Sequence, residues 1–250
     1  MHEHRGEYGI DGDFERISAR GQLAAIGAVT TGLAVVAVAG RAHGRHLTAA
    51  LAGASAAGLV ASTAWYAYAT RVGKFVVWDQ ILDGLALDGD ETVLDLGCGR
   101  GAVLCAAAKR LPRGRAVGVD LWHADQTDNS RQATLANAVA EGVSDRIEVH
   151  TADMTAVPLP DDSVDVVVSS LAIHNIAGNA GRRMALDEAV RVLRPGGRLA
   201  IADLFGTDRH AARLRELGWR DVRHRRLGWR MCYGGPWFST RLVTATKPGP

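Results

Sequence analysis

The chain has 250 residues, of which 47% are hydrophobic and 22% are charged, and its formal net charge is +2. This composition excludes an intrinsically disordered protein, and the small net charge argues against a nucleic-acid partner. The three cysteines, Cys98, Cys105 and Cys232, form no C-x-x-C pair, so we expect neither a disulfide framework nor a metal site.

Residues 1–22 are polar and mixed in charge, and we expect a mobile segment or a surface helix there. Two uncharged runs follow, of 17 residues at 23–39 and of 24 residues at 47–70. A helix of about 20 apolar residues spans a bilayer. The sequence therefore predicts an N-terminal segment over residues 1–72 that carries two transmembrane helices.

Aromatic residues end the second run, and Trp65, Tyr66 and Tyr68 are candidates for an interfacial belt followed by Arg71 and Lys74. The alternative is a soluble helical pair packed on the rest of the chain or on another subunit, since helices that are apolar all round can be buried. Small residues at four-residue spacing in this run favour close helix–helix contact, and with it a homo-oligomer.

The stretch 73–87 has apolar residues at helical spacing, among them Phe75, Trp78 and Ile81. This pattern predicts an amphipathic helix that enters a second domain over residues 73–250. Trp78 is a candidate substrate contact, and simple packing is the alternative for it.

A glycine-rich turn follows the apolar run 92–96, which only Asp95 interrupts. Gly97, Gly99 and Gly101 stand at every second position before another apolar segment begins. The order is strand, tight turn and helix, and glycine is needed where the backbone takes a positive φ or passes close to a ligand. The spacing differs from the G-x-G-x-x-G of dinucleotide-binding proteins. A turn without a ligand is the plain alternative.

The D-x-G-x-G-x-G pattern of these residues resembles the first motif of class I S-adenosylmethionine (SAM)-dependent methyltransferases. The resemblance implies a Rossmann-like, doubly wound α/β sheet of seven strands with an antiparallel last strand, here preceded by the pair of hydrophobic helices. It also implies SAM as cofactor. The cofactor contacts it implies in this motif are Asp95, Gly97, Cys98, Gly99 and Gly101.

An acid ends the second predicted strand, residues 115–120, 19 residues after Gly101. A carboxylate at that strand tip can accept hydrogen bonds from both ribose hydroxyls, so Asp120 is a cofactor candidate together with Leu121. The alternative for Asp120 is a helix N-cap.

Another acid, Asp153, follows the third predicted strand, residues 146–150. The resemblance implies that its side chain binds the adenine amino group and that Met154 contacts the adenine ring. The alternative for Asp153 is a loop cap.

The run 164–170 is rich in β-branched residues and predicts a buried parallel strand, whose carboxyl end is where open α/β sheets place their chemistry. Ser170 at this end is assigned to the cofactor. His174 is a candidate general base, because imidazole titrates near neutrality, or it only shapes the pocket. Asn175 orients the substrate or is a turn residue.

The remaining chain predicts a helix over 181–193, a turn at 194–197, a strand over 198–203, a helix over 210–217 and a last strand over 240–246. Aromatic residues gather in the loop before that last strand. We expect them to line an apolar acceptor pocket, with core packing as the alternative. The substrate candidates in this loop are Trp229, Tyr233 and Trp237.

Together these features predict a membrane-anchored methyltransferase that acts on a lipophilic small molecule or lipid. Because SAM is cytosolic, the resemblance places the catalytic domain on the cytoplasmic side of the cell membrane. One alternative is a methyltransferase of a soluble metabolite whose hairpin serves oligomerisation, and another is a SAM-binding membrane protein without catalysis. The asparagine-proline-proline-aromatic motif of many DNA methyltransferases is missing, and Ser169-Ser170-Leu171-Ala172 stands at that place.

Overall fold

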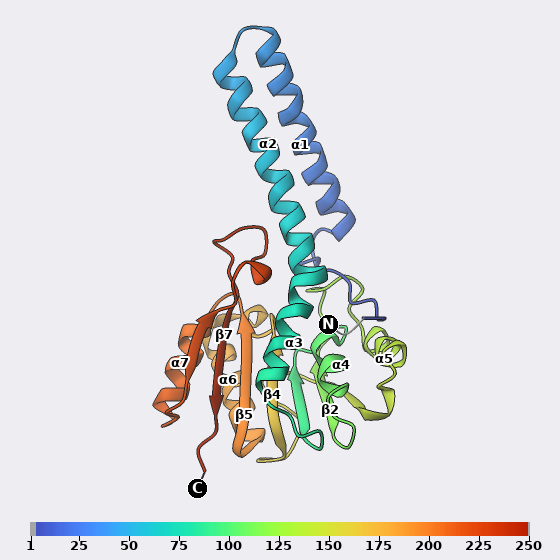
Figure 1. The fold of residues 1–250 in the computed structure, drawn as a ribbon, viewed down its shortest axis with the longest axis vertical. Helices are drawn as coiled ribbons and strands as arrows, with labels where there is room; N and C mark the ends of the chain where they lie inside the picture. Colours follow the sequence, from blue (N-terminus) through green and yellow to red (C-terminus); the bar gives the residue numbers. More distant parts are fainter. Residues whose placement is uncertain (1–3, 250) are drawn as a thin grey trace.

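A seven-stranded sheet organises the larger part of the molecule, in a computed structural model that describes residues 4–249 (Figure 1). The strand order is β3-β2-β1-β4-β5-β7-β6, with the first five strands parallel and β7 antiparallel to β5 and β6. The implied α/β sheet with an antiparallel last strand is confirmed. The strands are β1 (Thr92–Leu96), β2 (Arg115–Asp120), β3 (Ile147–Thr151), β4 (Val164–Ser170), β5 (Leu193–Asp203), β6 (Arg223–Arg226) and β7 (Arg241–Thr246).

The order of the strands reverses between β1 and β4, which lie side by side at the centre. Such a reversal leaves a crevice at the carboxyl ends of the strands. Strand β5 begins earlier than predicted, because Leu193 already pairs with Val164 before the register shifts and Arg198 pairs with Val166. The predicted turn at 194–197 is the bulge that this shift requires.

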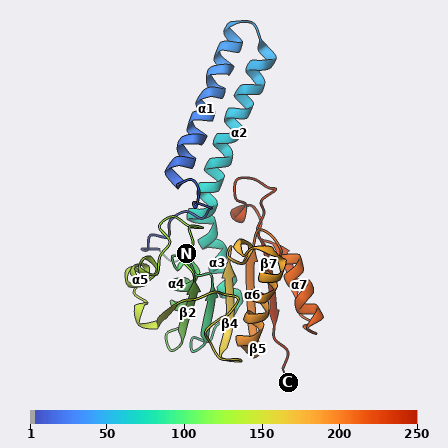
Figure 2. The same cartoon turned by 180° about the vertical axis from the view of Figure 1, so that it is seen from behind.

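Helices cover both faces of the sheet (Figures 1 and 2). One core lies between the sheet and α3, α4 and α5, and the other between the sheet and α6 and α7. Buried strand residues alternate between the two cores, as Val93 and Leu94 do. These helices are α3 (Lys74–Gly84), α4 (Ala102–Ala108), α5 (Arg131–Ala140), α6 (Gly178–Val192) and α7 (Thr207–Glu216), with short 3₁₀ turns at Ser144–Arg146, Ile173–Asn175 and Trp229–Met231.

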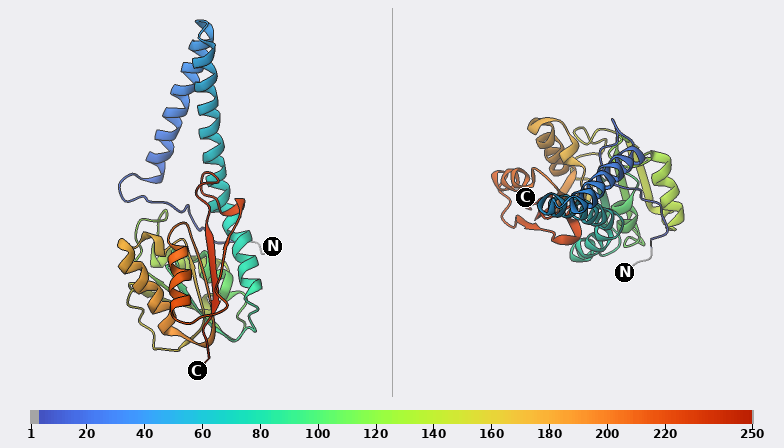
Figure 3. Two further views of the ribbon diagram at one scale, coloured as in Figure 1. Left: turned by 90° about the vertical axis from the view of Figure 1, so that its left-hand side faces the viewer. Right: turned by 90° about the horizontal axis from the view of Figure 1, so that it is seen from above.

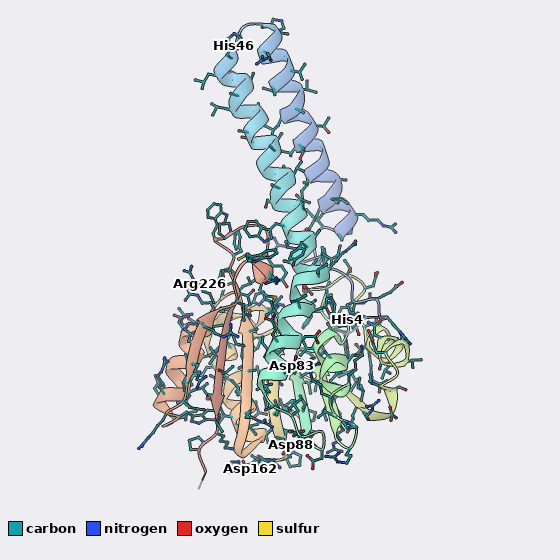
Figure 4. The ribbon with its side chains drawn as sticks, in the orientation of Figure 1. His4, His46, Asp83, Asp88, Asp162 and Arg226 are labelled. Atoms are coloured by element: carbon teal, nitrogen blue, oxygen red, sulfur yellow. The ribbon has the colours of Figure 1, made fainter. Side chains whose placement is uncertain are left out.

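The two apolar runs form a helical hairpin that projects from the carboxyl edge of the sheet (Figures 1 and 3). It consists of α1 (Ala19–Ala42) and α2 (His46–Tyr68), with His46 at the tip (Figure 4). The helices touch through small residues, since a Cβ atom at Gly40 would lie 3.2 Å from the backbone of Ala49. Both helices are long and apolar enough to cross a membrane by length and composition, and only 6% of each apolar window is buried.

Helix α2 continues without a break into the sheet domain through a π-helical turn, Ala69–Gly73, and then α3. The expected boundary at residue 72 therefore falls inside one continuous helix from His46 to Gly84. Gly73 permits a close approach there, because a Cβ atom would overlap the carbonyl of Arg230.

The polar N-terminal segment differs from the expected mobile segment or surface helix. Residues 4–14, here called the N-terminal strap, form no helix and pack along the sheet domain. The Arg5 and Gly6 N–H groups and the Tyr8 hydroxyl all donate to Oε1 of Glu141, at the carboxyl end of α5, over 2.8–2.9 Å. Tyr8 is buried, so the strap is held by apolar contact as well as by hydrogen bonds that the sequence pattern did not show.

Candidate functional site

The carboxyl end of β1 leads into a turn in which every second residue is glycine. Gly97, Gly99 and Gly101 have φ values of +72°, +50° and +84°, a region that L side chains rarely adopt. A Cβ atom at Gly97 would overlap the side chain of Ala172, and one at Gly99 would lie 2.7 Å from Oε1 of Gln126. The backbone of this turn therefore both bends and packs in a way that requires glycine.

Three adjoining cavities open at this edge of the sheet. The glycine-turn cavity, of about 50 Å³, is lined by Asp95, Gly97 and Gly99, whereas Gly101 is not among its lining residues. The Met154 cavity, of about 250 Å³, lies beside Asp120, and the His174 cavity measures about 230 Å³. Asp125 lines all three cavities, so together they form one site.

Asp95 carries a buried carboxyl group without a donor. It is 1% exposed, and no hydrogen bond from the residues between 4 and 249 reaches either of its oxygens. Burial, followed by the charge of Asp120, raises the pKa of the Asp95 carboxyl to about 8. An unpaired buried carboxylate is costly, so a cationic group in this cavity would be bound favourably.

Asp120 fixes the glycine turn against β2. Its Oδ2 accepts a hydrogen bond from the Gly99 N–H at 2.7 Å, and its Oδ1 accepts one from the Trp122 N–H at 2.6 Å. Burial raises the pKa of this carboxyl group. The side chain lines both the glycine-turn cavity and the Met154 cavity, where its remaining lone pairs are available to a ligand.

The N-terminal strap supplies Asp11 to the glycine-turn cavity and to the His174 cavity. Both Asp11 oxygens accept hydrogen bonds from Nζ of Lys74, at 2.7 and 2.8 Å. Lys74 is only 4% exposed, so the expectation that it lies at a membrane surface is wrong. It belongs to the site because α3 begins at this residue, directly beside the strap.

Comparisons with known proteins agree with this geometry. Residues 94–201 match the family model described as a methyltransferase domain. The chain is 36% identical over 132 residues to a ubiquinone/menaquinone biosynthesis C-methyltransferase of Dinoroseobacter shibae, which covers 52% of this chain and 50% of that protein. It is 36% identical over 123 residues to an arsenite methyltransferase of Halobacterium salinarum, which covers 49% of this chain and 29% of that protein.

The fold is shared with a solved SAM-dependent methyltransferase from Aquifex aeolicus, with a TM-score of 0.54 and 22% identity over 68% of this chain and 88% of that one. The chain contains a class I SAM-dependent methyltransferase domain. It spans half or less of the length of the two curated relatives above.

S-Adenosylmethionine is the cofactor of this methyltransferase family, and the residues of the site fit it. The unpaired Asp95 carboxylate suits the ammonium group at the methionine end of SAM. Asp120 would hold the ribose hydroxyls, and the Met154 cavity, which Leu121 and Asp153 also line, would hold the adenine. Cys98 and Ser170 line the glycine-turn cavity, and their contacts with the cofactor stay predictions.

His174 and Asp203 form a pair on the other side of Asp125. Nδ1 of His174 lies 2.5 Å from Oδ1 of Asp203, which is fully buried. The same carboxylate accepts the His174 backbone N–H at Oδ2, at 2.9 Å, and the Leu204 N–H at Oδ1, at 2.7 Å. The approach at Nδ1 lacks hydrogen-bond geometry, so it is an electrostatic contact that favours a charged imidazole, and Nε2 is the ring nitrogen left for chemistry. Asn175 lies beside it and donates to Oδ2 of Asp125 at 3.0 Å.

The expected substrate contact of Trp78 is corrected. This side chain is 1% exposed and lines none of the three cavities. Its Nε1–H donates to Oγ of Ser170 at 2.8 Å, so it supports the tip of β4 from within the core. The helical spacing that suggested Trp78 is that of the buried face of α3.

The aromatic side chains of the loop before β7 lie in two different places. Tyr233 is buried and lines the His174 cavity, and its contact with a substrate stays a prediction. Trp229 and Trp237 line none of the three cavities, and Trp237 is 82% exposed. Trp229 stacks on Tyr68 at the foot of the hairpin, with ring centroids 5.1 Å apart, so packing against α2 draws it away from the site.

The site also contains residues that the sequence did not indicate. Asp11 lies in a polar segment without a motif, and Asp125 stands in a loop of several acids. Tyr66, expected in an interfacial belt, instead lines the His174 cavity and packs edge-to-face on Tyr233. Of these residues and Asp203, only Asp203 could have been predicted from the sequence. It ends a predicted parallel strand, and the carboxyl ends of such strands form the edge where the active site lies.

Asp95→Asn is expected to stabilise the methyltransferase without cofactor, and to do so more at pH 8 than at pH 5. The raised pKa of Asp95 means that the folded chain keeps a proton that the unfolded chain loses above about pH 4. Wild-type stability therefore falls as the pH rises to about 8, and the uncharged amide avoids this loss. Thermal unfolding at both pH values measures the effect, with the exposed Asp145→Asn as control. Equal melting temperatures for Asp95→Asn and wild type at pH 8 would contradict the burial argument.

Proposed function

We propose that this chain is a membrane-anchored methyltransferase that transfers the methyl group of SAM to a lipophilic small molecule or lipid. The observation that carries the proposal is the position of the His174 cavity. Its wall includes Tyr66, which lies on α2 at the foot of the hairpin, together with Tyr233 from the aromatic loop. An acceptor bound there would stand directly below the helices.

The hairpin itself supports a membrane environment. Large apolar side chains such as Leu23, Val35, Leu51 and Val60 are exposed on it. The hairpin projects away from the sheet domain (Figure 1). Exposure of such an apolar surface to water is unfavourable, whereas exposure to lipid is not. The tip residues, near His46, are polar, and side chains there can reach the far headgroups (Figure 4).

Aromatic side chains surround the foot of the hairpin, which is where a membrane surface would lie. Trp65 donates from Nε1 to the carbonyl of Trp229 at 2.8 Å, and Trp229, Trp237 and Phe238 are exposed. Exposed aromatic rings near helix ends favour the headgroup layer. In this proposal the sheet domain lies on the cytoplasmic side.

The residues of the His174 cavity suit removal of a proton from the acceptor. SAM supplies a methyl group on a positively charged sulfur, which is electrophilic. Nε2 of His174 can take the proton of a hydroxyl or thiol acceptor while Asp203 stabilises the charged imidazole. Burial raises the pKa of Tyr66 to about 12 and that of Tyr233 far above its usual range, so both phenols stay neutral. The Tyr66 hydroxyl donates to the Asp11 carbonyl and the Tyr233 hydroxyl to Oδ2 of Asp11, so both would orient the acceptor through their oxygen lone pairs.

Two aspartates in the middle of the hairpin are expected to release the chain from membranes. Val35→Asp combined with Val60→Asp alters exposed positions on α1 and α2, and each charge costs about 3 kcal/mol in the centre of a bilayer. Flotation of the full chain with phosphatidylcholine vesicles measures binding. Val139→Asp, on an exposed position of α5, is the matched control and should float like wild type. If wild type stays at the bottom of the gradient as an oligomer that the aspartates dissociate, the hairpin serves oligomerisation.

The acceptor class is tested with SAM that carries a radiolabelled methyl group, added to membranes of the organism that encodes the chain. The proposal expects label in the organic extract. Label only in the aqueous phase indicates a soluble acceptor. Bound SAM with no labelled product in either phase indicates a binding protein without catalysis.

A further inference from the structure

A further cavity of about 280 Å³ lies away from the methyltransferase site and is lined by residues at and next to α6 and α7. Figure 2 shows these two helices on one face of the sheet. Four arginines line it, together with apolar side chains such as Leu186. Both helices begin at the carboxyl edge of the sheet, the edge from which the hairpin projects. The arginines are Arg182, Arg183, Arg209 and Arg213.

Two of these arginines have no acidic partner. Arg213 pairs with Asp187 at 2.9 Å, and Arg183 approaches the same carboxylate at 3.7 Å. Among residues 4–249, no carboxylate lies within 4.0 Å of the guanidinium groups of Arg182 and Arg209. Their hydrogen-bond partners are neutral oxygens, so the cavity keeps an excess of positive charge even though Glu216 also lines it.

His210 adds an unpaired buried nitrogen to this cavity. The residue is 3% exposed, and its Nε2 has no hydrogen-bond partner in the described chain. A Cβ atom at Gly206, the residue before the first turn of α7, would lie 3.9 Å from this nitrogen. Nε2 of His210 therefore lies close to the start of α7, whose dipole favours an oxyanion, and an oxyanion there would give this nitrogen a partner.

We propose that the α6–α7 cavity is a binding site for a phosphate-type oxyanion, held by Arg209, Arg182 and Nε2 of His210. Arginine binds such oxygens with paired N–H groups, and helix starts favour negative charge. Burial lowers the pKa of His210, so at neutral pH the ring is uncharged and can donate one N–H. The cavity is larger than one water or one phosphate ion requires, and its apolar wall would accept part of an organic body.

The site is connected to the methyltransferase centre through Arg182. Its NH2 group donates to the carbonyl of His174 at 2.7 Å, and its Nε donates to the carbonyl of Ile176 at 2.9 Å. An oxyanion that engages Arg182 would compete for these donors and alter the segment that carries His174. The phosphate can come from a lipid headgroup or from a soluble phosphorylated molecule.

Titration of inorganic phosphate by calorimetry, into the full chain in phosphatidylcholine nanodiscs, tests the proposal. Arg209→Ala is expected to weaken binding about tenfold, the scale of a lost charge-assisted contact. Arg209→Lys should retain part of the affinity. Arg220→Ala removes an exposed arginine outside the cavity and should bind as wild type does. Arg209 is exposed, so its variants should have the same melting temperature as the wild type.

No binding by wild type, or equal binding by Arg209→Ala and Arg220→Ala, would overturn the site. A second titration in nanodiscs that contain phosphatidylglycerol identifies the source. Lost phosphate binding there means that a lipid headgroup occupies the site, and unchanged binding means that it takes soluble phosphate. Neither readout needs methyl transfer, so the result is independent of the proposed catalytic activity.

Discussion

His174→Ala is expected to lower methyl transfer about a hundredfold, the range of a lost general base, and to leave SAM affinity unchanged. The side chain lies in the His174 cavity and is held by Asp203, while the residues that fit SAM line the two neighbouring cavities. Incorporation of label into the organic extract measures transfer, and calorimetry measures SAM binding.

The control for this substitution is His150→Ala. His150 is partly exposed on the edge strand β3, pairs with Glu148 at 2.8 Å and lines none of the three cavities. It should transfer methyl groups at the wild-type rate. If His174→Ala transfers methyl groups at the wild-type rate, the histidine is not a general base. The cavity would then only position the acceptor.

Asp120→Ala is expected to weaken SAM binding tenfold or more. The substitution removes the acceptor for the ribose hydroxyls, and it also leaves the Gly99 and Trp122 N–H groups without their partner. The glycine turn loses its hold on β2 at the same time. Calorimetric titration with SAM measures the affinity.

Asp90→Ala, at an exposed position before β1, is the matched control and should bind SAM normally. Asp120→Asn should fall between the two, because one amide oxygen can still accept while the amide nitrogen cannot. Unchanged affinity of Asp120→Ala would reject the ribose assignment.

The central sheet could be predicted from the sequence because its signals are local. The apolar run before Gly97, the acid of Asp120 and the β-branched run of β4 each lie within a few residues, and buried parallel strands require such runs. The cavity-lining positions of Asp95, Asp120 and Met154 follow from the same strand tips. Their roles toward SAM stay predictions until binding is measured.

The remaining site residues depend on contacts between distant segments, which no local pattern reports. Asp11 meets Lys74 across 63 residues, and Tyr66 meets Tyr233 across most of the chain. The predicted substrate contacts of Trp78 and Trp229 are wrong for a related reason. The spacing of an aromatic residue in the sequence does not show which surface its side chain packs against. Trp78 packs in the core beside the end of β4, and Trp229 packs against Tyr68 at the end of α2.

The continuous helix from His46 to Gly84 sets the distance and the orientation between the hairpin and the sheet domain that carries the reactive centre. A flexible linker would let the sheet domain swing, whereas one helix fixes both the height of His174 below the hairpin and the direction in which its cavity opens. The π-helical turn at Ala69–Gly73 adds a residue to that helix and so sets the rotation about its axis. The contact of Gly73 with Arg230 clamps this rotation in place. In a bilayer, acceptors would therefore be sorted by how deep their reactive atom lies.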